Sequence, residues 1–211
     1  MTYADVTIDS GHHESPEVIT SRELVGVWLF IAGDCVILIA LLFTYLYLRG
    51  LNTAQQWLPT GVHGASTLMA WLTVAVVAAS AWAIWSGENA ITRARPAASL
   101  QLVLATLLAL VGAGLSIQAI ASIPHATNAT SGVGQVAGSY ASTLLAIDIS
   151  NLVHLVVLVF LGLGVAARTK KGLISLERPG HARLVRIFWV WVTASVTAAA
   201  ITTTIFVASP K

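Results

Sequence analysis

Five apolar stretches, each long enough to cross a bilayer, constrain this chain more than any other feature of its sequence. They cover residues 25–48, 66–86, 98–122, 140–167 and 184–208 of 211. A transmembrane helix needs about 20 predominantly apolar residues, and in lipid each spanning segment must satisfy its own backbone hydrogen bonds. Only 9% of the residues are charged, against roughly a quarter in soluble domains. The sequence predicts an all-α polytopic membrane protein, a single bundle of five transmembrane helices.

The remaining residues leave little room for a soluble domain. Residues 1–23 form a polar, acidic tail, and residues 24–211 form the membrane domain. The tail has no basic region followed by an apolar core and a small-residue cleavage site, so we expect no cleaved signal peptide. The first span itself is expected to direct insertion.

Lysine and arginine residues fall unevenly on the two sides that five spans define. Two of the eleven, Arg49 and Lys211, lie on the side opposite the N-terminus. The other nine lie on the N-terminal side: Arg22, Arg93, Arg95, Arg168, Lys170, Lys171, Arg178, Arg183 and Arg186. Basic loops remain cytoplasmic, so we predict a cytoplasmic N-terminus and an exterior C-terminus in a bacterial cytoplasmic membrane. No aromatic or modular pattern accompanies these basic loops, which argues against nucleic-acid binding.

The first span contains one charged side chain between residues 26 and 48, Asp34. It lies about 14 Å from the cytoplasmic end of its helix, near the middle of the bilayer. An ionised carboxylate there is costly, so Asp34 must face protein, water or a partner. Two interpretations stay open: a protonated Asp34 bonded to a neighbouring helix, or a proton-linked or lipid-contacting role. Cys35 is the only cysteine, which excludes an internal disulfide, and we expect it to pack as an apolar residue.

The fourth span contains a polar stripe of Asp148, Asn151 and His154. Their i, i+3, i+6 spacing spreads them over about 120° of one helix side, so the stripe is expected to face protein. His154 lies at a depth similar to that of Asp34, which makes a hydrogen bond between them geometrically possible. A structural histidine satisfied by a neighbour is the favoured interpretation.

We expect no catalytic, cofactor-binding or metal-binding residues in this chain. Only one of its six histidines, His154, lies inside a span, whereas a bis-histidine haem needs two axial ligands. Asp148 is displaced by about 9 Å along the helix from His154, so one ion could not easily take Asp34, Asp148 and His154 together.

The first span resembles that of subunit III of the haem-copper terminal oxidases, in its short five-helix form. The resemblance rests on Gly26, Trp28, Asp34, Cys35, Phe43 and Tyr45. Three further segments are similar to the family. In 112–118, Gln118 stands where the family commonly has glutamate. In 138–157, Asn151 and His154 stand where it has two histidines. In 188–192, Val190 stands in place of a histidine, and Thr193 follows in place of an aspartate.

The resemblance implies an accessory role in aerobic electron transport, in a quinol or cytochrome c oxidase. Such a subunit packs beside catalytic subunit I and other subunits, binds phospholipid and supports proton uptake, while haem and copper belong to the catalytic subunit. The candidate proton-linked or lipid-contacting residues are Asp34, Asp148, Asn151, His154 and Gln118.

Two other functions stay open. The replaced polar positions also fit the subunit III-like accessory proteins of nitric oxide reductases. A small proton-linked transporter is a third possibility, although the chain shows no inverted repeat with paired broken helices.

Overall fold

The computed structural model describes residues 16–52, 57, 64–123, 125–126, 135–136, 138–174 and 180–207. Its five helices are α1 (Pro16–Gly50), α2 (Thr67–Thr92), α3 (Ala98–Ala121), α4 (Gly138–Lys170) and α5 (Gly180–Ile205). All five are long and apolar enough to cross a membrane, which confirms the predicted five-helix architecture. The two-residue strands β1 (His125–Ala126) and β2 (Gln135–Val136) pair antiparallel between α3 and α4 and were not predicted.

Most helices extend beyond the apolar stretches that predicted them. The second stretch ends at residue 86, but α2 continues to Thr92, where the Arg93 N–H bonds to the Ile91 carbonyl. Ala94 then takes a φ of 50°, outside the helical region. Hydropathy marks the part of a helix suited to lipid, whereas the helix ends where its backbone bonding ends. The third and fifth predictions run past the observed ends at Ala121 and Ile205.

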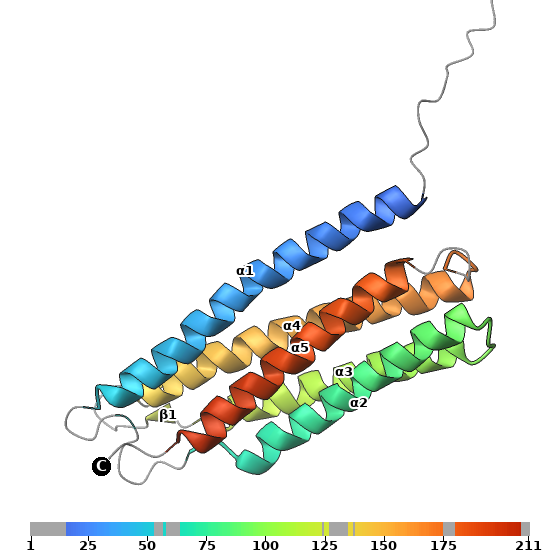
Figure 1. The fold of residues 1–211 in the computed structure, drawn as a ribbon. Helices are drawn as coiled ribbons and strands as arrows, with labels where there is room; N and C mark the ends of the chain where they lie inside the picture. The colour runs from blue at the N-terminus through green and yellow to red at the C-terminus, as the bar shows by residue number, and fades with distance from the viewer. Residues whose placement is uncertain are drawn as a thin grey trace, which may run out of the picture.

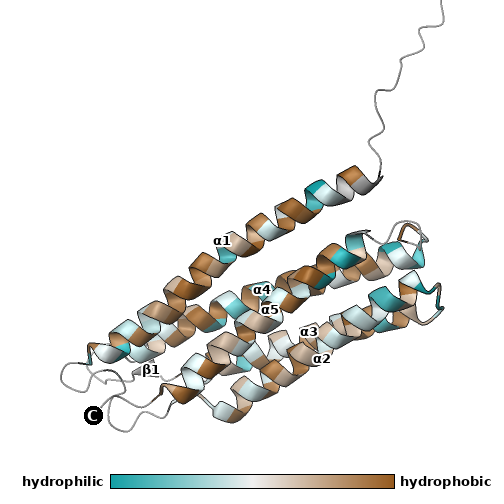
Figure 2. Ribbon diagram, in the orientation of Figure 1, coloured by the Kyte–Doolittle hydropathy of each residue, from teal (hydrophilic) through white to brown (hydrophobic). Residues whose placement is uncertain are grey.

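Helices α2 to α5 pack together, with α3 against α2 and α4, and α5 against α2 and α4 (Figure 1). Helix α1 packs on α4 and α5, and Figure 1 shows it diverging from them toward its own N-terminal end. We compared the most apolar 18-residue stretch of each helix. In α1, 6% of the residues of this stretch are buried inside the protein, whereas in α5 the share is 50%. Hydrophilic residues gather at the end of the bundle where α1 begins (Figure 2). The outer side of α1 is therefore left for lipid or another protein.

Small residues and one buried polar link hold α2, α3 and α5 together. The Trp189 indole N–H donates to Ser80 Oγ over 2.8 Å, and Ser80 Oγ donates to the Ala105 carbonyl over 2.6 Å. A Cβ added at Gly112 would come within 3.1 Å of Val77 Cγ2. In lipid, the hydrophobic effect does not drive helices together. Close backbone approach at small residues instead stabilises their association through dispersion contacts.

An aromatic cluster fixes the C-terminal end of α1 to the bundle. The Tyr45 and Tyr140 rings lie 4.9 Å and 5.5 Å, centroid to centroid, from the Trp57 ring. The Trp57 indole donates to the Val207 carbonyl over 3.2 Å, and the Tyr140 hydroxyl accepts from the Ala65 N–H over 2.7 Å. This cluster explains why α1 stays close to the other helices at this end.

Candidate functional site

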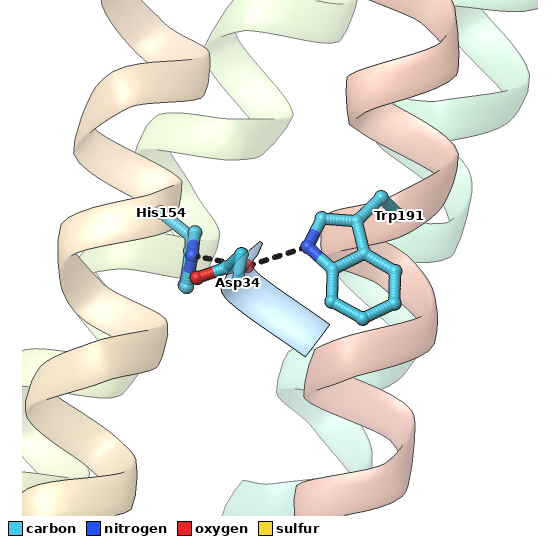
Figure 3. Close-up of polar contacts among 3 residues, drawn as sticks. All are labelled: Asp34, His154 and Trp191. Atoms are coloured by element: carbon cyan, nitrogen blue, oxygen red, sulfur yellow. Dashed lines mark hydrogen bonds and ion pairs between the residues drawn. The ribbon is translucent and has the colours of Figure 1, made fainter. Parts of the chain in front are cut away.

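Asp34 of α1 lies between α4 and α5, and its side chain is only 11% exposed (Figure 3). His154 Nε2, from α4, lies 2.9 Å from Asp34 Oδ2. The Trp191 indole N–H, from α5, donates to the same oxygen over 2.6 Å. The cross-helix contact between Asp34 and His154 that the sequence allowed is therefore present. One carboxylate oxygen joins α1 to two other helices.

The geometry defines how this pair can carry protons. A neutral His154 that donates from Nε2 leaves Nδ1 unprotonated, and Asp34 then accepts two donors as a carboxylate. His154 Nδ1 is buried and has no hydrogen-bond partner among the described residues. An N–H at Nδ1 would therefore have no acceptor there, so the geometry favours the tautomer that is protonated at Nε2.

Aromatic rings shield one side of the cluster. The Phe188 ring is tilted against the His154 imidazole at a centroid distance of 6.4 Å. Phe30 of α1 meets Phe188 edge-on at 5.6 Å. An apolar wall of this kind lowers the local dielectric and strengthens the polar contacts beside it.

The other candidate residues do not join this cluster. Asn151 is buried and Asp148 is half-buried, and both line a separate cavity between α2, α3, α4 and α5. Gln118 is exposed on α3. No group of three or more His, Cys, Asp and Glu side chains that could hold a metal ion occurs within the described ranges. Cys35, next to Asp34, is half-buried and unpaired.

Trp191 is the site residue that the sequence argument missed. It lies in the segment 188–192, which was noted only for its resemblance. A buried indole N–H usually needs an acceptor, so a tryptophan inside a span is a signal for a polar partner. Two tryptophans, Trp189 and Trp191, share this segment, and their N–H groups go to Ser80 and Asp34 respectively.

An apolar groove of about 440 Å³ adjoins the cluster between α1, α4 and α5. Phe30 and Phe188 form part of its wall. Glu23 and His181 also line it, with His181 Nε2 3.8 Å from Glu23 Oε1. The groove has the size and lining for an apolar chain, with ionisable groups beside it.

Comparison with models of known protein families gives no match, and comparison with curated proteins gives none either. We therefore infer function from the residues, from their geometry and from the resemblance of the segments that form the site.

Proposed function

We propose that this chain is a non-catalytic subunit III of a respiratory haem-copper oxidase. In this role it packs beside catalytic subunit I and other oxidase subunits and supports proton uptake during turnover. One observation carries the proposal: three segments that resemble the family, 26–45, 138–157 and 188–192, meet in the cluster of Asp34, His154 and Trp191.

The proposal assigns the cluster two tasks. Asp34 fastens α1 to α4 and α5 through His154 and Trp191, which compensates for the little apolar surface that α1 buries. The Asp34–His154 pair also holds a proton within the membrane. Haem and copper belong to the partner catalytic subunit in this assignment, and the present chain supplies packing and proton-linked groups.

The groove between α1, α4 and α5 is assigned to a phospholipid chain. Its wall is apolar, and the exposed side chains of Arg22 and Arg183 lie close in sequence to Glu23 and His181. Arginine near an apolar groove favours a phosphate headgroup with its acyl chain inserted. Of the nine Lys and Arg residues that the structure describes, eight belong to this end of the bundle, which supports a cytoplasmic N-terminus and an exterior C-terminus.

One observation favours the nitric oxide reductase accessory protein as a second candidate. At the position where the oxidase family has an aspartate, the Thr193 hydroxyl donates to the Trp189 carbonyl of its own helix over 2.9 Å. Val190, in place of a histidine, is exposed on α5. These two positions supply no interhelical polar contact to the described bundle.

Purification of the tagged chain in mild detergent tests the proposal. We expect a large catalytic subunit to accompany the chain, with haem in stoichiometric amount, and the complex to consume oxygen. The untagged chain carried through the same steps is the control. Consumption of nitric oxide instead of oxygen would favour the second candidate. Recovery of the chain as a lone oligomer without haem would overturn both and favour a small proton-linked transporter.

A further inference from the structure

A second cavity, lined by both apolar and polar side chains, lies at the opposite end of the bundle from the groove. It has a volume of about 50 Å³ and is enclosed by the start of α2, the end of α3, the first half of α4 and the end of α5. Ser66 and Ser122 are exposed at its rim, whereas Thr73, Ser116 and Asn151 are buried deeper. This volume is enough for one small ion or a few water molecules.

Three hydroxyl groups of this cavity already donate their proton to the backbone. Thr73 Oγ1 and Thr203 Oγ1 each donate to the backbone carbonyl four residues earlier, over 2.9 Å. Ser122 Oγ donates to the carbonyl three residues earlier over 2.7 Å. A hydroxyl has a single proton, so these three oxygens can offer only lone pairs to a guest.

Asp148 adds a carboxylate that no described Lys, Arg or His side chain neutralises. Within the described chain it has no hydrogen bond or ion pair, and no Lys, Arg or His side chain lines the cavity. The other titratable group near Asp148 is Tyr140, whose hydroxyl already accepts the Ala65 N–H. An ionised carboxylate at this depth needs a cation, and the carboxylate, hydroxyl and amide oxygens among the lining groups are of the kind that suits a hard cation. A single carboxylate balances one positive charge.

We propose that this cavity is a binding site for one small monovalent cation of the Na⁺ type. The Asp148 carboxylate neutralises the ion, and hydroxyl and amide oxygens, including those of Thr73 and Asn151, complete its shell. The ion enters between Ser66 and Ser122, at the end of the bundle where few basic residues occur. Because α2, α3, α4 and α5 all contribute to the wall, a bound ion stabilises their packing. This site is independent of the oxidase assignment.

Thermal unfolding of the full-length chain in lipid nanodiscs tests the site. NaCl should raise the unfolding midpoint above that in choline chloride of equal ionic strength and pH, since a ligand that binds only the folded state stabilises it. Asp148→Asn should raise the half-saturating Na⁺ concentration by about tenfold or more, and Thr73→Val should raise it to a smaller extent. Thr44→Val, which removes an exposed hydroxyl of α1 outside this cavity, is the control and should keep the wild-type response.

Direct ²²Na⁺ binding to the wild-type chain provides a readout that needs no variant to fold. Saturable binding near one ion per chain is expected. Equal midpoints in NaCl and choline chloride would overturn the proposal, as would an unchanged Na⁺ response in Asp148→Asn. A midpoint that depends on pH but not on Na⁺ would also overturn it, because a proton would then neutralise Asp148.

Discussion

Replacing Asp34 by leucine should loosen α1 from the rest of the bundle. Asp34 Oδ2 accepts from both His154 and Trp191, so leucine removes two interhelical hydrogen bonds and leaves two N–H donors without an acceptor. Interhelical hydrogen bonds in membranes contribute about 0.6 to 1.7 kcal/mol each, which gives a loss of about 1–3 kcal/mol for the pair. Asparagine should cost less, since its amide oxygen can take the place of Oδ2 and keep both donors bonded.

Thermal unfolding in detergent measures this difference, with the order wild type, Asp34→Asn and Asp34→Leu expected from the highest midpoint to the lowest. Thr44→Val is the matched control on the same helix, because the exposed Thr44 hydroxyl bonds only to the Ala40 carbonyl one turn earlier. Midpoints for Asp34→Leu equal to those of the control would refute the idea that the cluster fastens α1. If Asp34→Asn assembles normally but slows turnover or proton uptake, the proton-holding role gains support. If this variant keeps full activity, only the structural role of Asp34 is supported.

Three further predictions follow from the topology, the accessory role and the packing. Reporters placed near Lys170 and at Lys211 should localise to the cytoplasm and the exterior respectively, as the distribution of basic residues requires; a cytoplasmic Lys211 reporter would contradict this topology. Removing the chain from its complex should leave haem and copper per catalytic subunit unchanged while activity declines during sustained turnover, and the stoichiometric loss of one cofactor without collapse would show that this chain holds it. Ser80→Ala should lower the free energy of unfolding by about 1–3 kcal/mol, because the Trp189 N–H loses its acceptor and the Ala105 carbonyl loses the donor that it has besides its helical one; calorimetry that finds no change would show that this link is dispensable.

The helices were predictable because span length and hydropathy are local properties of the sequence. Helix ends were less so, since α2 continues through Gly87 and Glu88 to Thr92, beyond the apolar stretch. In this last part of α2, Ala90 and Ile91 pack in the core, and Arg186 of α5 reaches Glu88, with its Nε 2.7 Å from Glu88 Oε2. That ion pair joins residues distant in sequence, and nothing in the hydropathy of either segment indicates it.

The candidate site was predictable only in part. Equal depth in the membrane suggested that Asp34 and His154 could meet, and helical rise correctly separated Asp148 from His154. Trp191 was not predictable, because the face that α5 turns toward α1 depends on how five apolar helices pack. Gln118 shows the same limit: Ser116, two residues earlier, is buried against the bundle, while Gln118 points to the opposite side and is exposed.

The meeting of Asp34 and Trp191 across 157 positions of sequence has a consequence for biogenesis. A chain made from its N-terminus delivers α1 to the bilayer well before α5 leaves the ribosome. Until then Asp34 lacks at least one of its two donors, and an unpaired Asp at the centre of a span opposes insertion by about 3 kcal/mol. The favourable insertion free energy of the many apolar residues of α1 can offset this cost, so we expect α1 to insert into the bilayer before α5 is made. The hydrogen bond from Trp191 of α5 to Asp34 would then form late in folding. In a chain whose synthesis stops before α5, α1 would lack this bond to the bundle.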